Sequence, residues 1–190
     1  TPQAGKVGEY ITVIGKNFGL SGKILFQKGK DSREAESNLP PECAQGWWTE
    51  EAAVVKVPGL DIGSWQVKVL RNDGQASKPS VLRVVPGAPG PGLCKLDPAS
   101  GPPGLEMSLL GERFSGENLE TQFFKKKKGK VLQWTKEEVK AQVPEGAQSG
   151  RVQVFVKDIS TNVIPFEVRD CREEACQGKL TCCPDGSCRA

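Results

Sequence analysis

The chain contains an internal repeat, and this repeat limits the folds it can adopt more than any other feature. The first copy reads G-x-x-I-x-V-I-G-K-N-F-G from Gly8 to Gly19. The second copy reads G-x-x-M-x-L-L-G-E-R-F-S from Gly104 to Ser115. Glycine, apolar and aromatic residues recur at the same spacing in both, which predicts two copies of one structural unit.

Further landmarks follow each copy in the same order. Trp48-Thr49 precedes Val57-Pro58 by the spacing that separates Trp134-Thr135 from Val143-Pro144. Each copy then continues with an alternating apolar run and a closing apolar segment. In the first copy these are Trp65, Val67, Val69 and residues 81–84, and in the second Val152, Val154, Val156 and residues 165–168. Four landmarks in one order make a chance match improbable.

Apolar and polar residues alternate along these runs with a period near two, as half-buried antiparallel strands require. Turn residues such as Asn72-Asp73-Gly74 and Lys128-Gly129-Lys130 separate the runs. A helical stripe long enough for a core helix is missing. The pattern therefore predicts an all-β fold with two tandem β-sandwiches.

The predicted organisation has four parts. The first sandwich covers residues 1–85, the second covers residues 93–169, and a cysteine-rich tail covers residues 170–190. Residues 86–92, Pro-Gly-Ala-Pro-Gly-Pro-Gly, form the linker, which its prolines should keep extended and fairly stiff.

Composition argues against an enzyme. The 190 residues include no histidine, which removes the commonest general base and most zinc and haem ligation. Neighbouring carboxylates such as Glu50-Glu51 point to opposite faces of a strand and make no acid/base pair. We expect no cofactor and no metal. The net charge, 26 − 23 = +3, predicts no nucleic-acid partner, and no apolar run approaches the ~18 residues of a membrane span, so we expect no membrane insertion.

The cysteines predict disulfides and an oxidising compartment. No C-x-x-C pair occurs and no histidine completes a zinc site, so we favour disulfides over metal or redox chemistry. The tail has too few apolar residues to form a core, and bridges must order it. The count of seven is odd, which leaves at least one thiol free or bonded to another chain. The disulfide candidates are Cys43, Cys94, Cys171, Cys176, Cys182, Cys183 and Cys188.

The repeat resembles the IPT/TIG family of immunoglobulin-like domains. The family pattern joins an opening strand, P-x-x-G-x-x-G, V-x-I-x-G-x-N-F-G, W-[ST] and V-P, and the two matches together cover about residues 2–168. The matching residues are 98–104, Leu109, Gly111, Phe114, Trp134-Thr135 and Val143-Pro144 in the second copy, with 15–19, Trp48-Thr49 and Val57-Pro58 in the first. The resemblance implies immunoglobulin-like sandwiches and, in surface proteins, a spacer, adhesion or structural role.

The first copy departs from this pattern at its start. In the second copy residues 93–97 supply a first strand ahead of Pro98, whereas the first copy starts at Thr1-Pro2. A sandwich without that strand exposes backbone donors and acceptors beside apolar residues. We expect another segment to occupy this position; the alternative is that the strand was trimmed or belongs to a preceding domain.

The tail offers a candidate for that strand. Residues 178–186 loosely resemble residues 95–101. Our hypothesis is that Lys179, Leu180 and Thr181 of one subunit add a strand to the first sandwich of the next, with a bridge through Cys43 at the joint. Strand addition that does not close forms a head-to-tail polymer.

Two groups of residues are candidate ligand contacts. Trp47 should face outward because Trp48 beside it should be in the core, and an exposed indole can stack on a sugar ring. A lysine run, Lys125, Lys126, Lys127 and Lys128, could bind phosphate or an acidic polysaccharide. The alternatives are that Trp47 packs beneath the polar insertion 27–46 or on the other domain, and that the lysines protect a sheet edge.

The sequence thus favours a non-catalytic structural protein, secreted or on the cell surface, which forms a surface filament or array with other copies of itself through strand exchange and disulfides. The alternative is a monomeric adhesion or carbohydrate-binding module of a larger surface protein, with cell-surface glycans or other surface proteins as partners.

Overall fold

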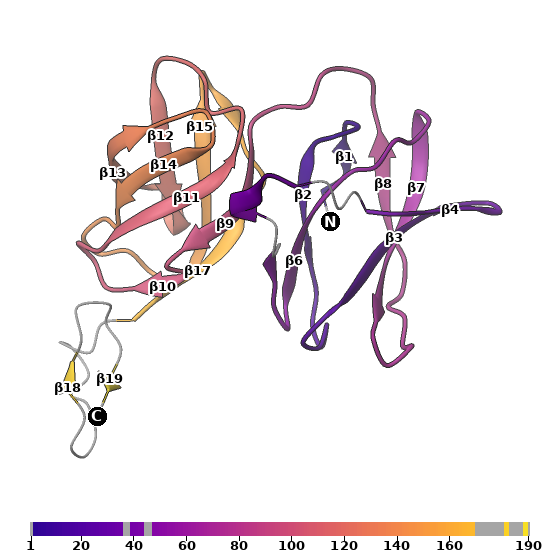
Figure 1. Ribbon diagram of the computed structural model, residues 1–190, viewed down its shortest axis with the longest axis horizontal. Coiled ribbons are helices and arrows are strands. Elements are labelled where there is room, and N and C mark those ends of the chain that lie inside the picture. Colours follow the sequence, from indigo (N-terminus) through magenta and orange to yellow (C-terminus); the bar gives the residue numbers. More distant parts are fainter. Residues whose placement is uncertain (1, 36–38, 44–46, 170–180, 183–187, 190) are drawn as a thin grey trace.

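The computed structural model describes residues 2–35, 39–43 and 47–169, and the backbone of two short strands at 181–182 and 188–189. Regular structure in these residues is almost entirely β-strand, apart from the short 3-10 helices η1 (Pro41–Cys43) and η2 (Phe124–Lys126). The strands build two β-sandwiches that lie side by side, each from one half of the chain (Figure 1). The predicted all-β fold with tandem sandwiches is confirmed.

The first unit (residues 2–84) has two sheets. One sheet has the order β1-β8-β7-β3-β4 and the other has the order β2-β6-β5. β1 runs parallel to β8, and the other neighbours are antiparallel. The strands are β1 (Ala4–Gly5), β2 (Tyr10–Ile14), β3 (Gly22–Lys28), β4 (Asp31–Glu34), β5 (Trp47–Trp48), β6 (Ala52–Lys56), β7 (Gly63–Arg71) and β8 (Ser80–Val84).

The second unit (residues 92–168) follows one continuous strand path, β10-β17-β15-β12-β13-β14-β11-β9, with β16 added to β15. β13 joins the two layers, because its first half pairs with β12 and its second half with β14. The strands are β9 (Gly92–Asp97), β10 (Ser100–Gly101), β11 (Glu106–Glu112), β12 (Leu119–Phe123), β13 (Lys127–Trp134), β14 (Glu138–Gln142), β15 (Gly150–Val156), β16 (Ile159–Ser160) and β17 (Ile164–Val168).

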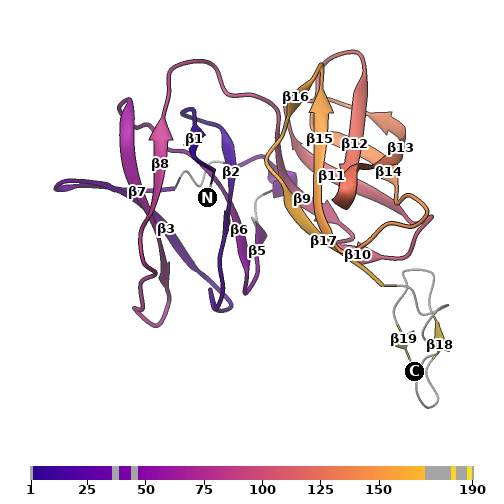
Figure 2. The same ribbon diagram turned by 180° about the vertical axis from the view of Figure 1, so that it is seen from behind.

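Two further strands follow near the C-terminus. β18 (Thr181–Cys182) pairs antiparallel with β19 (Cys188–Arg189). Both lie beyond the second unit in the two opposite views (Figures 1 and 2).

The alternating residues of the first unit point into its core. Trp65 and Leu82, from neighbouring strands, are 4% and 0% exposed. Trp48 packs against the same core, and its indole Nε1 donates a hydrogen bond to the Gly19 carbonyl oxygen at 3.0 Å. The fully buried members of this core include Ile11, Ile24, Phe26, Val57, Val67 and Val84.

The repeated glycine and phenylalanine are a packing pair in both units. A Cβ atom added to Gly15 would lie 2.7 Å from Cζ of Phe18, and one added to Gly111 would lie 2.6 Å from Cζ of Phe114. Atoms cannot approach so closely without displacement, so the phenylalanine ring requires a glycine beneath it. This contact explains why the two residue types recur at a fixed spacing.

The hydrophobic core of the second unit extends into the first unit, and we call this joint cluster the shared core. Tyr10 and Val54 of the first unit cluster with the buried residues of the second, and they are 2% and 5% exposed. β2 and β6 therefore pack one face on the core of the first unit and the other face on the second unit. The linker is held close to this contact, because Nε of Arg113 donates to the Gly90 carbonyl oxygen at 2.6 Å.

A disulfide and an ion pair reinforce the shared core. Cys43 is bonded to Cys94 of β9, with their Cα atoms 5.7 Å apart. Nζ of Lys56 lies 2.6 Å from Oε1 of Glu112, and the two side chains are only 10% and 18% exposed. The hypothesis that Cys43 bridges two subunits is therefore wrong, because Cys43 is already bonded within its own chain.

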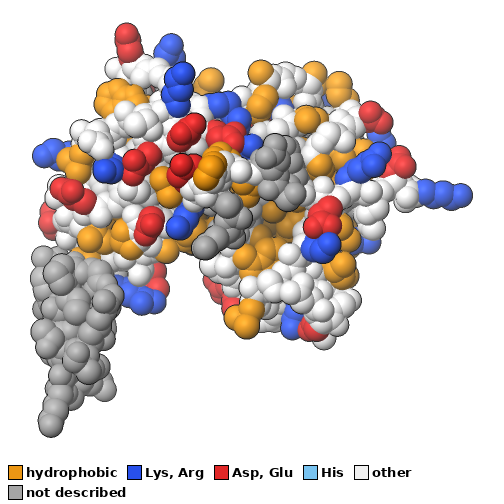
Figure 3. All heavy atoms as spheres, viewed as in Figure 1, with side chains coloured by type: hydrophobic (Ala, Val, Ile, Leu, Met, Phe, Trp, Pro, Cys, Tyr) orange, Lys and Arg blue, Asp and Glu red, His pale blue; other side chains and the backbone are white. Residues whose placement is uncertain are grey.

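Charges of both signs are mixed on the surface. Figure 3 shows lysine and arginine side chains interspersed with aspartate and glutamate on both units in the face it draws. This mixture agrees with the small net charge of +3. Such a surface creates no strong field of one sign over that face.

Candidate functional site

β2 is an edge strand, whereas its counterpart in the second unit lies inside a sheet. β11 pairs with β14 on one side and with β9 on the other. β2 pairs with β6 in the same way that β11 pairs with β14. Within the described chain, no strand pairs with the other side of β2. The first unit thus has a free edge at the position that β9 fills in the second.

The backbone of β2 presents hydrogen-bonding groups to this free edge. Gly15 N–H donates to the Glu51 carbonyl oxygen at 2.8 Å, and the Glu9 carbonyl oxygen accepts from Val57 N–H at 3.0 Å. Odd-numbered residues of this segment therefore bond toward β6. Because a strand alternates the direction of its backbone groups, those of Thr12 and Ile14 point toward the free edge.

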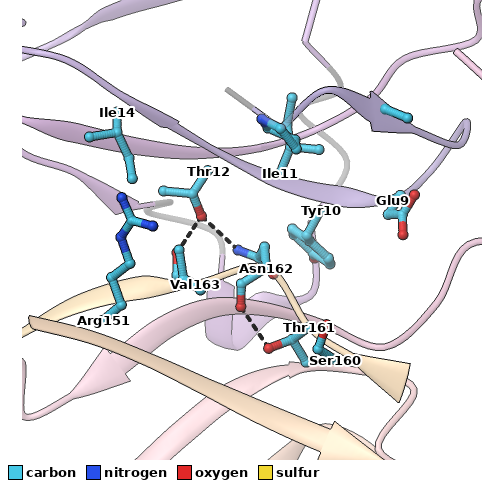
Figure 4. Close-up of a pocket in the computed structure, with 12 residues that line it drawn as sticks. Glu9, Tyr10, Ile11, Thr12, Ile14, Arg151, Ser160, Thr161, Asn162 and Val163 are labelled. Atoms are coloured by element: carbon cyan, nitrogen blue, oxygen red, sulfur yellow. Dashed lines mark hydrogen bonds between the residues drawn. The ribbon is translucent and has the colours of Figure 1, made fainter. Parts of the chain in front are cut away.

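A hollow of about 440 Å³ lies along this edge. Its walls come from β1 and β2 of the first unit and from Arg151 and residues 160–163 of the second (Figure 4). Arg151 lies near Ile14, and Glu9 lies toward the opposite end of the view. Among the described residues that line it, Glu9 is the single carboxylate. The lining therefore holds no carboxylate pair for acid/base chemistry.

Polar groups at the centre of the hollow tie the two units together. The Thr12 hydroxyl donates to the Val163 carbonyl oxygen, and Nδ2 of Asn162 donates to Oγ1 of Thr12 at 3.0 Å (Figure 4). The Asn162 amide also binds the Leu93 backbone, accepting from its N–H at 2.8 Å and donating to its carbonyl oxygen at 3.0 Å. Asn162 thus fixes the distance between β2 and the start of β9.

The arrangement suits the binding of an extended peptide. Unpaired strand edges offer a row of backbone donors and acceptors, and a chain added there continues the sheet. Ile11 and Ile14 supply apolar surface to the hollow, and Thr12 and Asn162 supply polar groups. In the described part of the chain, no group of three or more Cys, Asp or Glu side chains is placed to hold a metal ion.

Trp47 lies where the two units meet. Its side chain is half-buried and packs on the shared core, while its indole Nε1 is buried and has no hydrogen-bond partner among the residues that the structure describes. Trp47 does not line the hollow at β2.

The lysine run lies at the start of β13. Lys125 and Lys126 adopt left-handed backbone angles in η2, and all four lysine side chains are exposed. Nζ of Lys128 lies 2.6 Å from Oε2 of Glu120. At Lys127 and Lys128, β13 pairs with β12, and its pairing with β14 begins only at Lys130. Protection of a sheet edge by these lysines, the structural alternative expected from the sequence, therefore stays a prediction. None of the four lysines lines the hollow at β2, and they are far from Trp47 in sequence.

The remaining candidates fall outside the described residues. These are Lys179, Leu180, Cys171, Cys176 and Cys183, together with the side chains of Thr181, Cys182 and Cys188.

Sequence reasoning missed the second-unit wall of the hollow, above all Asn162 and Arg151. No motif marks these residues, because they become neighbours of β2 only when the two units pack. One signal was available: Ala52–Lys56 reads A-A-V-V-K, a nearly continuous apolar run. Such a run indicates a strand covered on both faces.

These features place the chain among proteins built from tandem β-sandwiches. No family model matches it, and no curated protein matches it. No helix in the described residues has both the length and the apolar character to cross a membrane.

Several solved structures resemble parts of this fold. The surface glycan-binding protein PbSGBP-B from Prevotella bryantii is 18% identical over 86% of this chain and 38% of its own, with a TM-score of 0.36. SGBP-B of the Bacteroides ovatus mixed-linkage glucan utilization locus, in complex with a mixed-linkage heptasaccharide, is 12% identical over 87% and 43%, with a TM-score of 0.32. The plexin A4 extracellular region is 16% identical over 87% and 17%, with a TM-score of 0.36.

The chain spans less than half the length of each of these proteins. The identities and TM-scores are low, so the likeness carries no argument about what this chain binds.

Proposed function

We propose that this chain is a non-catalytic structural module of a secreted or cell-surface protein, built from IPT/TIG-type sandwiches, and that its first sandwich accepts an added β-strand along β2. The free edge carries this proposal. The same position in the second unit is filled by β9, whose Leu93 and Leu96 are 0% and 1% exposed. A strand that buries such side chains stabilises a sandwich by apolar burial as well as by hydrogen bonds.

Two further observations support strand acceptance. Backbone groups of β2 point toward its free edge, where an extended peptide would bind. The hollow there also offers apolar side chains of β2 and the polar Asn162 side chain of the second unit. The shared core and the disulfide between Cys43 and Cys94 hold both walls of the hollow at a fixed separation. A preformed site avoids part of the entropy cost of binding.

A peptide with the sequence of β9 tests the proposal. Gly-Leu-Ser-Lys-Leu-Asp, with serine in place of Cys94, is titrated into the isotope-labelled protein and followed by amide NMR. We expect the amide signals of Thr12 and Ile14 to shift and their hydrogen exchange to slow. A scrambled peptide of the same composition is the control. Absence of any shift, or shifts confined to another surface, would contradict strand acceptance.

Proline substitution supplies a matched pair of variants. Ile14→Pro removes an N–H that faces the free edge, so the ladder to β6 survives and peptide binding is lost. Leu110→Pro, at the corresponding position of β11, removes an N–H that faces β9. We expect Leu110→Pro to cost about 1–3 kcal/mol more stability than Ile14→Pro, because it leaves a partner in β9 unsatisfied. Equal losses of stability in Ile14→Pro and Leu110→Pro would show that the β2 edge is not free.

Glycan binding is the second candidate function, and one observation favours it. Trp134 on β13 is 48% exposed, and an exposed indole can stack on a sugar ring. Titration with a mixed-linkage heptasaccharide, followed by tryptophan fluorescence, tests it. Binding that is lost in Trp134→Ala and kept in Leu132→Ala would support this function, and an unchanged fluorescence would oppose it.

A further inference from the structure

We infer that the strand accepted by β2 is residues 178–182 of a second copy of this chain, with Leu180 as its apolar anchor. This inference rests on the proposed function, because it names the occupant of the site described there. It goes further in predicting a head-to-tail polymer of identical subunits.

The pairing of β9 with β11 gives the register for the donated strand. Leu96 lies opposite Leu109, and both side chains are fully buried in the second unit. The repeat places Val13 at the position of Leu109. A residue opposite Val13 would therefore face the core of the first unit, where a leucine has a buried apolar site.

The tail repeats the residues that occupy this register. Lys179-Leu180 matches Lys95-Leu96, and a proline and a glycine follow each pair, two and five residues after Leu96 and four and six residues after Leu180. In this register Leu180 lies opposite Val13, Lys179 opposite Ile14 and Thr181 opposite Thr12. The lysine would then take the partly exposed position that Lys95 holds in β9.

The backbone of the tail is extended at Thr181 and Cys182. β18 starts at Thr181 and pairs with β19 on one side. An antiparallel hairpin strand keeps its other edge for a further partner. β18 and β19 lie beyond the second unit, on the side away from β2 (Figures 1 and 2). A donor at one end and an acceptor at the other form a heterologous contact, which extends into an open chain unless the rotation closes a ring.

Three occupants can be distinguished by experiment: a second copy, residues that precede Thr1 in a longer protein, and an unrelated protein. The test uses the full chain with its disulfides oxidised, in size-exclusion chromatography with light scattering and in electron microscopy. We expect filaments or a ladder of multiples of the 20.5 kDa chain mass.

Two variants separate the donor from the acceptor. Leu180→Asp disables the donor and leaves β2 intact, whereas Ile14→Pro disables the acceptor and leaves the tail intact. Each variant alone should remain a monomer. A mixture of the two has one working donor and one working acceptor, and it should form a dimer of twice 20.5 kDa that grows no further. Leu132→Asp, which changes an exposed leucine on β13, is the matched control and should assemble as the native chain does.

Each outcome decides the inference. A capped dimer from the mixture supports it. Monomeric native protein overturns it, and so does assembly that persists in Leu180→Asp. If the β9 peptide binds β2 while the native chain stays monomeric, strand acceptance stands and the second copy is rejected as occupant. If the Thr12 and Ile14 amides are protected in the monomer of a longer chain, the occupant is the preceding segment.

Discussion

The disulfide between Cys43 and Cys94 should be a major source of stability, and its contribution follows from the length of chain that it closes. The two cysteines are 51 residues apart in sequence. Closing a loop of this length removes about 4 kcal/mol of conformational entropy from the unfolded chain at 25 °C in the chain-entropy treatment. For a chain of this size, that corresponds to a melting temperature lower by roughly 8–16 °C without the bridge.

The assay is guanidinium chloride unfolding of Cys43→Ala, Cys94→Ala and the double variant, followed by tryptophan fluorescence. Substitution is preferable to a reductant, because a reductant would also act on the cysteines of the tail. Each single variant already loses the bridge. We therefore expect all three variants to be destabilised by a similar amount near 4 kcal/mol, with strong non-additivity.

Additive costs would refute this reasoning. Suppose that each single variant lowered the free energy of unfolding only slightly, as the loss of one buried sulfur atom would, and that the double variant lowered it by the sum. The two cysteines would then not be bonded. A peptide map under non-reducing conditions provides a direct check, because the bridge predicts one cross-linked pair containing Cys43 and Cys94.

Three further perturbations test the packing. Lys56→Ala removes a charged hydrogen bond from Glu112, which keeps Arg113 as an ion-pair partner, and should cost about 1.5–3 kcal/mol; the coupling in a double-mutant cycle with Glu112→Ala should be measurable, and zero coupling would contradict the ion pair. Gly15→Ala forces a Cβ atom against the Phe18 ring and should lower stability by about 1–3 kcal/mol in urea unfolding, whereas an unchanged midpoint would show that the ring moves aside. Asn162→Ala removes the acceptor of a buried N–H and should cost about 1–3 kcal/mol with faster exchange of the Leu93 amide; unchanged exchange would argue against this bond.

Much of the fold could be predicted from local patterns. The period of two along each run, such as Trp65, Val67 and Val69, placed these side chains on one face, and the structure buries them together. The repeat also identified the position that β9 fills in one unit and that no described strand fills in the other. These predictions succeed because strand periodicity and turn chemistry act over a few residues.

The candidate site was predicted only in part. The repeat indicated that β2 has a free edge, but Arg151 and Asn162 enter the hollow from the second unit, about 140–150 positions further along the chain. Trp47 was expected either to face solvent or to pack on a neighbour, and its indole lies against the shared core. Sequence spacing cannot resolve such alternatives, because they depend on which surfaces meet.

The sequence by itself determined the strands and their grouping into two similar sandwiches, whereas the packing of Gly15 and Gly111 beneath phenylalanine rings came from the structure. Only the tertiary structure decided that the units share a core, that Cys43 pairs with Cys94, and that β2 borders a walled hollow. The physical reason is one of range. Periodicity and sterics are set by neighbours along the chain, whereas a disulfide, an ion pair or a groove requires distant segments to come within a few ångströms of each other.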